Sequence, residues 1–512
     1  MSTKKILAVL LALFVLATAV SGCGNSGSSS ADSQSGSSAT SENSASTEDT
    51  ASTDGEVPTI SLMVVCGTTP PDADAVAEKL SEITREKIGC NVEFITMEIG
   101  NVAQQLNLLL SGGDDTLDVF MAGISVPYST IVNNGQALSL DTLMEPYAEE
   151  VKTALGEKVY ESGRVNGELY GIGRLLGQAC KTCYNLRRDI AEEFGYKNGD
   201  KVDLAELTEL FGKVREKYPD TPLIGPMNGV PSIGDSRIDS LGNKLGVLDN
   251  YGQDTTVTNY YESAGYEELV GYFKQWKEMG CYMADILNVT DAPIDYIPSG
   301  KAFGCFASHF SAEMNGIWSS QNFGTDIASL QIYEDAVAIT PGAYECINPA
   351  TKNPEAAAAL ISLMATDPDV ENLLINGIEG QHYQVLEDNT ATYVDGKDIS
   401  TTGWCLGYSW TALNSTISIP FEYPADYYDR MLAANKNAQQ SKAFGCQFDL
   451  TGVSDAVSAC TNVVNQYENA LSGGAVEDFD ATLAQFQQGL RDAGIDEIVA
   501  AKQEQLDAFL AG

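Results

Sequence analysis

Residues 107–120 read NLLLSGGDDTLDVF, and this stretch decides the fold that the sequence predicts. Its first half completes an amphipathic helix that begins at Val102. Ser111, Gly112 and Gly113 end that helix, because glycine supplies the backbone freedom that a helix end needs. The letters LDVFM that follow are apolar enough for a buried strand. The stretch therefore predicts a helix, a glycine turn and a buried strand in this order.

The region before this stretch has the pattern of a β-α-β unit. Residues 59–66, TISLMVVC, form a short β-rich run, residues 73–87 have helical periodicity, and residues 90–95 alternate like a second strand. The turn GTTPPD lies at the carboxyl end of the first strand, where open α/β sheets border their ligand crevice. We therefore predict that Thr68 and Thr69, in this turn, contact ligand.

Several segments, in a fixed order, resemble the family 1 extracellular solute-binding proteins of ABC transporters, the group that includes maltose-binding protein. NLLLSGGDDTLDVF is similar to the helix, Ser-Gly turn and Asp-Val strand of that family. NGELYGIGRL, followed by CYNLRRDIAEEFG, is similar to its Gly-x-x-Tyr-Gly-x-Pro segment and to the strand and helix after it. Gly173 stands where the family usually has proline.

Later segments continue the resemblance. PSGKAFGCF, from Pro298, is similar to the family's Gly-Lys-Ala strand before a ligand-side turn. KNPEAAAALISLMATDPDV is similar to its Asn-Pro-Glu-Ala-Ala helix, with Asn353 as N-cap, Pro354 in the first position and Glu355 in the first turn. NGIEGQHYQ resembles an element of one subgroup.

The C-terminal run SKAFGCQFDLTGVSDAVSACTNVVNQYENALSGG resembles the C-terminal helical domain of a LipO-like subgroup of lipoprotein solute-binding proteins. That domain has no settled function. Its apolar residues recur at helical spacing, first at Val457, Cys460, Val463, Val464, Tyr467 and Leu471, and then at Leu483, Phe486, Leu490, Ile495, Ile498 and Val499. Such stripes face a core in most proteins, so we expect these helices to pack against the second lobe.

The resemblance implies an α/β, two-lobed, periplasmic-binding-protein-like fold of class II with additional C-terminal helices. We expect lobe 1 to comprise 57–172 with 341–385, lobe 2 to comprise 173–340 with 386–440, and the C-terminal helical domain to comprise 441–512 and pack on lobe 2. The chain would cross between the lobes near Ile172, Gly173 and Arg174 and again near Thr340, Pro341 and Gly342. Glycine and proline suit a hinge there, and ordinary turns are the alternative.

The first 56 residues predict an anchor and a tether. Residues 1–22 have the basic start and apolar run of a signal peptide that is too short to span a bilayer. Val-Ser-Gly-Cys at its end resembles the bacterial lipobox, which would make Cys23 the acylated N-terminus; an ordinary secretory signal is the alternative. Residues 23–56 are too poor in apolar side chains to fold, and as a coil they would extend about 30 Å. We expect a lipid-anchored, extracellular protein on the outer face of the bacterial cytoplasmic membrane.

Charge and residue counts exclude several classes of function. A net charge of −42 makes nucleic acid an improbable partner. The chain has 11 cysteines, one CxxC at Cys180 and Cys183, and two histidines, without metal-ligand spacing, so we expect no metal and no cofactor. The sequence contains no GxxxxGK[ST] run, the motif of an ATP site. It also contains no Gly-x-Ser-x-Gly motif, which would indicate a serine nucleophile. A glycoside hydrolase is the enzymatic alternative, but we expect no enzyme.

Candidate ligand contacts follow from position in the family. Sugars expose apolar C–H faces ringed by hydroxyls, so their sites combine flat aromatic side chains with planar polar groups. Besides Thr68 and Thr69, the candidates are Ser125, Tyr128, Arg174, Gln178, Ser308, His309, Trp404 and Trp410. Core packing is the alternative for Tyr128, His309 and the tryptophans, and a surface ion pair is the alternative for Arg174. His382 is expected to be structural.

Together these features predict the substrate-binding lipoprotein of an ABC importer, a monomer that captures an extracellular carbohydrate, closes on it and delivers it to membrane permease subunits. An oligosaccharide is the expected ligand. A peptide, or a uronate or other anionic ligand, is the alternative within transport. A non-transport surface receptor is the alternative outside it.

Overall fold

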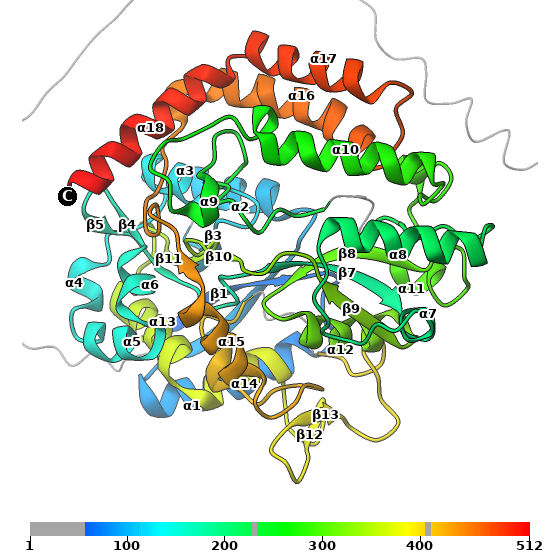
Figure 1. Ribbon diagram of the computed structural model, residues 1–512. Helices are drawn as coiled ribbons and strands as arrows, with labels where there is room; N and C mark the ends of the chain where they lie inside the picture. Colours follow the sequence, from blue (N-terminus) through cyan, green and yellow to red (C-terminus); the bar gives the residue numbers. More distant parts are fainter. Residues whose placement is uncertain (1–56, 114, 228–232, 405–410) are drawn as a thin grey trace, which may run out of the picture. The chain divides into compact units, whose positions relative to one another are not determined.

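The computed structural model describes residues 57–113, 115–227, 233–404 and 411–512. Cys23 and Trp410 lie outside these residues. Two separate sheets organise the described part (Figure 1). We call the body around the five-stranded sheet lobe 1 and the body around the three-stranded sheet lobe 2.

Lobe 1 is built on a mixed sheet that starts with the predicted β-α-β unit. Its strands, in spatial order, are β2 (Asn91–Glu98), β1 (Thr59–Cys66), β3 (Val119–Ala122), β11 (Tyr344–Ile347) and β6 (Gly171–Gly173). β1 runs parallel to β2 and β3, whereas β11 is antiparallel to both of its neighbours. The apolar residues of β1 alternate between two hydrophobic clusters, because successive side chains of a strand point to opposite faces.

Helices cover both faces of this sheet. They are α1 (Ala73–Lys87), α2 (Val102–Ser111), α3 (Tyr128–Asn133), α4 (Asp141–Met144), α5 (Ala148–Leu155), α6 (Glu157–Glu161), α13 (Pro354–Thr366) and α14 (Pro368–Asn376). The alanine-rich helix α13 begins at the predicted residue, and Asn353 precedes it as N-cap without a side-chain capping bond. The predicted helix over 73–87 is also confirmed.

Lobe 2 is built on three antiparallel strands in the order β8 (Gly304–His309), β7 (Lys181–Arg187) and β9 (Ile327–Gln331). Its helices and short 3-10 turns are α7 (Arg188–Glu193), α8 (Leu204–Lys217), α9 (Asp249–Gly252), η2 (Tyr260–Glu262), α10 (Ala264–Glu278), η3 (Ile286–Asn288), α11 (Pro293–Tyr296) and α12 (Ala312–Phe323). A buried aromatic group around Tyr184, Phe211 and Trp276 forms the centre of its core.

The C-terminal helices α16 (Ser454–Ser472), α17 (Phe479–Asp492) and α18 (Ile495–Ala511) belong to the core of lobe 2. Figure 1 shows α16 and α17 beside α10. Cys460, Leu471, Phe486 and Leu490 are buried there, and the other members of both predicted stripes pack against the same cluster. The helical stripes therefore face a core, as their periodicity predicts.

The chain segment 386–440 contacts both lobes, although the sequence predicts that it belongs to lobe 2. Trp404 and Leu413 are buried in the core of lobe 1, whereas Met431 on α15 (Tyr427–Asn437) packs with Phe310 and Met314 of lobe 2. Apolar side chains of one segment can be buried in the core of either lobe, because burial away from water stabilises both arrangements. The position of a segment in the sequence therefore does not determine its lobe.

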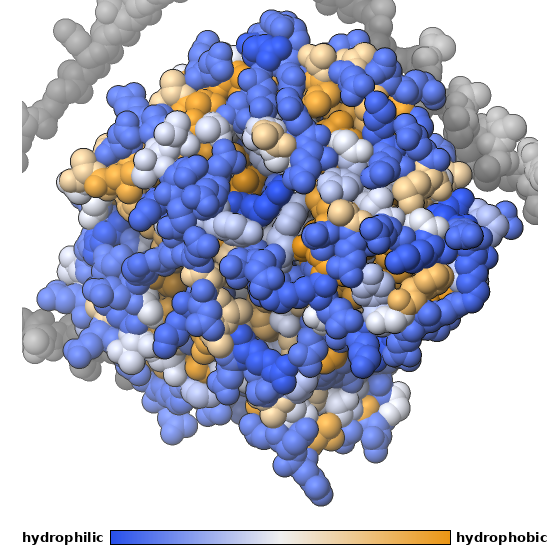
Figure 2. Space-filling view, in the orientation of Figure 1, coloured by the Kyte–Doolittle hydropathy of each residue, from blue (hydrophilic) through white to orange (hydrophobic). Residues whose placement is uncertain are grey.

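Short paired strands and turns complete the described part. They are β4 (Arg164–Val165) with β5 (Glu168–Leu169), β10 (Val337–Ala338) with β14 (Gln439–Gln440), β12 (Tyr383–Val385) with β13 (Ala391–Tyr393), and the 3-10 turns η4 (Ser415–Ile417) and η5 (Thr451–Val453). The face in Figure 2 is mostly hydrophilic, in agreement with the large negative charge of the chain. Within the described residues, no helix has both the length and the apolar content that a membrane span requires.

Candidate functional site

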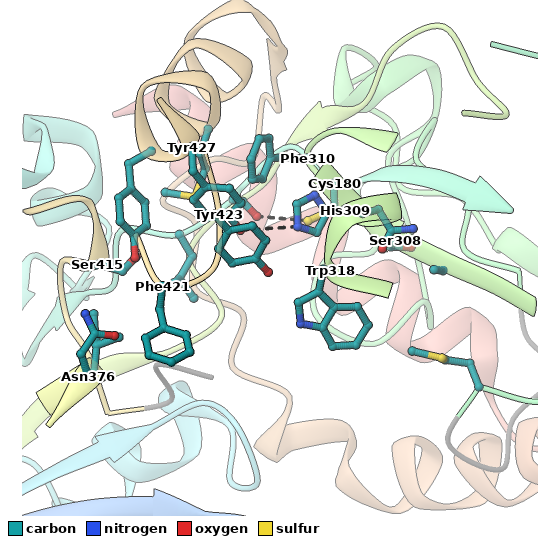
Figure 3. Close-up of a pocket in the computed structure, with 18 residues that line it drawn as sticks. Cys180, Ser308, His309, Phe310, Trp318, Asn376, Ser415, Phe421, Tyr423 and Tyr427 are labelled. Atoms are coloured by element: carbon teal, nitrogen blue, oxygen red, sulfur yellow. Dashed lines mark hydrogen bonds between the residues drawn. The ribbon is translucent and has the colours of Figure 1, made fainter. Parts of the chain in front are cut away.

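A pocket of about 360 Å³ lies where lobe 1, lobe 2 and the segment around α15 meet (Figure 3). Lobe 2 contributes the end of β8 and the start of α12, and lobe 1 contributes the end of α14. The lining residues are Leu176, Gly177, Cys180, Met227, Ala307, Ser308, His309, Phe310, Asn315, Trp318, Ile375, Asn376, Ser415, Phe421, Tyr423, Tyr427, Tyr428 and Met431.

Aromatic rings dominate one wall of the pocket. Tyr423 stacks on Tyr427 with ring centroids 4.0 Å apart and planes at 19°. Tyr427 also packs edge-on against Phe310 at 5.2 Å. Figure 3 shows the rings of Phe421 and Tyr423 across the pocket from the indole of Trp318. Flat rings on opposite sides of a space of this size suit the apolar faces of pyranose rings.

His309 sits at the end of β8 and is neutral near pH 7. Burial lowers the pKa of His309 to about 4, and the hydrogen bond to the backbone of Ser311 only partly opposes that shift. Its Nδ1 atom lies 3.1 Å from the carbonyl oxygen of Ser311, and its Nε2 atom lies 3.5 Å from the hydroxyl of Tyr427. A neutral imidazole can exchange hydrogen bonds with hydroxyl groups without adding charge to the pocket.

Asn376, the last residue of α14, offers an acceptor in a fixed orientation. Its Nδ2 atom donates to Asn372 Oδ1 at 2.8 Å and to the carbonyl oxygen of Ile419 at 2.9 Å. These two bonds identify the nitrogen side of the amide. Its Oδ1 atom is buried and receives no hydrogen bond from any described residue.

The pocket has no formal charge in the part of the chain that the structure describes, since no Asp, Glu, Lys or Arg is among its lining residues. This neutrality stands out in a chain with a net charge of −42. A buried anion or cation is stable only when it is paired, so this lining favours a neutral ligand.

Of the predicted site residues, Ser308 and His309 line the pocket. Gln178 lies in the segment between the lining residues Gly177 and Cys180, but it is not itself part of the lining. Thr68, Thr69 and Ser125 are exposed on the loops after β1 and β3 and also lie outside the lining.

Tyr128 and Trp404 lie in the core of lobe 1 and not in the pocket. Tyr128 is 4% exposed, stacks on Tyr344 at 4.1 Å and donates its hydroxyl to the carbonyl oxygen of Gly163. Trp404 is 4% exposed and lies 5.7 Å from the ring of Phe94. Both rings thus follow the core-packing alternative, because a large ring gains most when its whole surface leaves water.

Arg174 is also buried and belongs to an ionic group inside lobe 1. Its Nε donates to the carbonyl oxygen of Ala412 at 2.5 Å, and its charge acts on the buried carboxyls of Glu345 and Glu371. Burial raises the pKa of Glu345 to about 7 and that of Glu371 to about 8, while Arg174 opposes both shifts. A surface ion pair, the expected alternative for Arg174, is therefore wrong, because the residue is only 3% exposed.

Most of the pocket aromatics were not predicted from the sequence. Phe421, Tyr423, Tyr427 and Tyr428 come from the run FEYPADYYDR, in which rings alternate with charged and turn-forming residues. Aromatic side chains within such a polar segment do not form the apolar face of a core-packed helix. Their clustering is therefore the sequence signal that could have identified them as pocket residues.

The remaining chemistry-bearing groups give no metal or disulfide site in the described ranges. The nine cysteines described there, including Cys180 and Cys183, are all free thiols. No group of three His, Cys, Asp or Glu side chains in those ranges could hold a metal ion. His382 is fully buried and binds Asp72 at 3.0 Å, which agrees with the structural role expected for it.

Comparison with known proteins identifies the fold of this two-lobed chain. The crystal structure of the N-glycan transport solute-binding protein NgtS from Streptococcus pneumoniae superimposes on 89% of this chain and 99% of its own, with a TM-score of 0.75 and 20% identity. The chain has the fold of the ABC-transporter solute-binding proteins. An extracellular solute-binding protein from Bifidobacterium longum subsp. infantis gives a TM-score of 0.60 over 90% of this chain and 99% of its own, at 15% identity.

Sequence comparisons agree with the structural ones. A carbohydrate ABC transporter substrate-binding protein of Streptococcus pneumoniae serotype 4 is 23% identical over 474 residues, which cover 90% of this chain and 92% of that protein. The family described as "Domain of unknown function (DUF3502)" matches residues 442–511. The resemblance to solute-binding proteins with an additional C-terminal domain, and the two-lobed α/β fold it implies, are confirmed.

Proposed function

We propose that this chain is the substrate-binding protein of an ABC importer and that it captures an extracellular oligosaccharide. It is a binding protein and not an enzyme. The observation that carries the proposal is the pocket between the lobes, with stacked rings on one wall and neutral hydroxyl, imidazole and amide groups around them. The carbohydrate transport relative and the NgtS complexes with Man1GlcNAc and Man5GlcNAc support the same ligand class.

The ligand that fits best is a neutral saccharide. A uronate or a peptide brings carboxylates or charged termini, and these need a cation that the described lining does not contain. Arg174, the expected clamp for a carboxylate, is buried inside lobe 1. The lining therefore favours the oligosaccharide over the anionic alternatives.

We propose a contact set that combines predicted and newly found residues. Ser308 and His309 stay in the set, and Trp318, Tyr423 and Asn376 join them from the pocket walls. The predicted contacts Thr68, Thr69, Ser125 and Gln178, which are not buried, stay predictions for the outer part of a longer ligand. Trp410 lies outside the described residues and also stays a prediction.

The finer points of transport are also proposals. Acylation of Cys23 would hold the protein on the outer face of the membrane, and the Ser/Thr-rich segment after it would keep the lobes close to the permease subunits. A monomer satisfies this role. Mass spectrometry of the membrane-extracted chain tests the anchor, because a diacylated N-terminal Cys23 has a defined added mass, whereas an unmodified one excludes it.

Ligand-induced thermal stabilisation of the full chain tests the function. Oligosaccharides of mannose and N-acetylglucosamine are the first probes, with oligouronates and short peptides as comparison classes. A ligand that binds only the native state raises the melting temperature by mass action, so we expect a shift with neutral oligosaccharides and none with the other classes. Recovery of the sugar unchanged distinguishes binding from hydrolysis. A shift caused only by uronates or peptides would contradict the proposed ligand class.

A further inference from the structure

The C-terminal domain is anchored in lobe 2 over most of its length. Phe486, Leu490 and Ile498 are fully buried in the cluster that also contains the core of lobe 2. Lys502 on α18 is fully buried as well, and its ammonium donates to Leu241 O at 2.9 Å, Asn243 Oδ1 at 2.7 Å and Gly246 O at 3.1 Å. This anchoring makes the three helices part of lobe 2, so any movement of that lobe carries them along.

The segment that leads into these helices, residues 440–447, contacts both lobes. Ala443 and Cys446 are buried in a cluster with Leu241 and other residues of lobe 2. Phe444 packs against the core of lobe 1 instead. We call residues 440–447 the bridging segment, because its neighbouring side chains divide between the two lobes.

Gln447 makes a polar contact of the bridging segment with lobe 1, and Gln440 makes another by accepting from Lys158 of α6. Its Nε2 atom donates to the carbonyl oxygen of Ser162 at 3.0 Å and to the hydroxyl oxygen of Tyr344 at 2.7 Å. Tyr344 lies on β11, is 1% exposed and stacks on Tyr128. The amide of Gln447 is therefore bound to a buried, closely packed part of lobe 1.

The same segment binds the chain crossing that precedes β11. The backbone N–H of Gly445 donates to Thr340 Oγ1 at 2.8 Å, and this hydroxyl donates to the carbonyl oxygen of Ala443 at 3.3 Å. Thr340 belongs to the second predicted hinge. A rotation of the lobes about this crossing has to stretch or exchange the hydrogen bonds of Thr340 and Gln447.

We propose that the C-terminal domain is an interlobe brace: helices anchored in lobe 2 hold Gln447 on lobe 1. This contact sets the balance between two lobe arrangements, the one in this structure with Gln447 bound to Tyr344 and one in which the lobes have rotated and this contact is broken. Gln447 is thus a positioning residue, which never has to touch the ligand. A pocket of about 370 Å³ between Phe509, at the end of α18, and Lys158 and Ser162 beside it leaves space for lobe 1 to move against the domain. The brace gives this domain of unknown function a mechanical role.

Distance measurements between the lobes, without any ligand, test the brace. Spin labels carried on p-acetylphenylalanine at Glu86 of α1 and Glu209 of α8 report the interlobe distance in the full chain and leave the native thiols unchanged. Gln447→Glu keeps the length of the side chain but removes both donated bonds. We expect it to shift the ratio of the two lobe arrangements by roughly tenfold, because each lost hydrogen bond changes such a ratio several-fold.

Gln505→Glu is the matched control. Gln505 lies on α18, and its amide exchanges hydrogen bonds with the backbone of Asp449, inside the same domain. The same charge change there should leave the distance distribution as it is. Tyr344→Phe, which removes one acceptor of Gln447 with almost no change in shape, should shift the ratio in the same direction by roughly threefold.

The proposal is overturned if Gln447→Glu and Tyr344→Phe both leave the distribution unchanged, or if Gln505→Glu changes it as much. If Gln447→Glu does not fold, Tyr344→Phe decides alone. Since no ligand is present, the result is independent of the proposed transport function.

Discussion

At the scale of single residues, different side chains of the pocket provide aromatic stacking and hydrogen bonding. The rings of Tyr423 and Trp318 present flat apolar surfaces, whereas Asn376 and His309 present hydrogen-bonding groups without charge. Stacking depends little on the pattern of hydroxyls, and hydrogen bonds depend on it strongly. We therefore expect the rings to contribute affinity for sugars in general and Asn376 to contribute selectivity among them.

Tyr423→Ala should weaken binding of the best oligosaccharide by roughly tenfold, because one wall of the ring sandwich is lost. Isothermal titration calorimetry measures the change. Leu108→Ala, which truncates an exposed apolar side chain on α2 outside the pocket lining, is the control and should leave affinity unchanged. Equal affinities for Tyr423→Ala and the unmodified protein would remove Tyr423 from the contact set.

The buried carboxyls near Arg174 predict a pH dependence of stability. Burial raises the pKa of Glu371 to about 8, well above the value of 4.5 for a free side chain, so the folded state binds its proton more tightly than the unfolded state. The resulting stability is fully present below about pH 4.5 and is lost as pH rises through about 8. Glu371→Gln mimics the protonated form and should lessen this loss.

Urea unfolding between pH 5 and 8.5 measures the effect of Glu371→Gln. We expect the free energy of unfolding of the variant to exceed that of the unmodified protein at pH 8.5 by on the order of 2 kcal/mol, and the difference to fall towards pH 5. Glu355→Gln, at an exposed glutamate of α13, is the control. A difference that does not vary with pH would show that Glu371 does not titrate in this range.

At the scale of elements, α15 connects the pocket wall to the first crossing between the lobes. The helix carries Tyr427, Tyr428 and Met431 into the pocket. Further along it, Asn435 Oδ1 accepts from the backbone N–H of Gln178 at 2.8 Å, and Asn435 Nδ2 donates to the carbonyl oxygen of Leu176 at 2.7 Å. One amide therefore holds two pocket walls at a fixed separation.

Asn435→Asp should weaken ligand binding by roughly fivefold, because the new carboxylate keeps the accepted bond but repels the carbonyl oxygen of Leu176. Calorimetric titration with the same oligosaccharide measures it. The exposed Asn437, two residues further on the helix, gives the matched control Asn437→Asp. If both variants bind equally well, the amide of Asn435 does not position the pocket walls.

At the scale of the whole molecule, the C-terminal helices complete lobe 2 and do not form a separate unit. Tyr261 of η2 and Tyr266 of α10 pack on Phe486 of α17, with ring centroids 4.7 and 6.3 Å from that of Phe486. Lobe 2 without these helices would expose a large aromatic surface to water.

Truncation after residue 440 should therefore abolish the cooperative unfolding of lobe 2. Circular dichroism melts of the full and truncated chains measure this, with the full chain expected to give a sharp transition and the truncated chain a broad or missing one. A truncated chain that unfolds as sharply, and at the same temperature, would mean that the helices are a dispensable addition.

The sequence by itself determined the local elements, the two-lobed class and the stripes of the C-terminal helices. The local elements and the stripes depend on hydrophobic periodicity, caps and turns that act over a few residues, whereas the two-lobed class followed from the resemblance to the solute-binding family. The resemblance to the family also placed Ser308 and His309 at the pocket, because they directly follow the Gly-Lys-Ala-like strand. It misplaced Tyr128, Trp404 and Arg174, which fill the core of lobe 1.

Only the tertiary structure decided which rings meet across the pocket and how the C-terminal domain reaches lobe 1. The neighbouring sequence does not distinguish a tyrosine that lines a pocket from a tyrosine that lies in a core. Which surface each ring contacts depends on segments hundreds of residues away. The bond from Gln447 to Ser162 spans 285 positions in the chain. Contacts of that range leave no periodic trace in the sequence, because they are fixed by the packing of whole lobes.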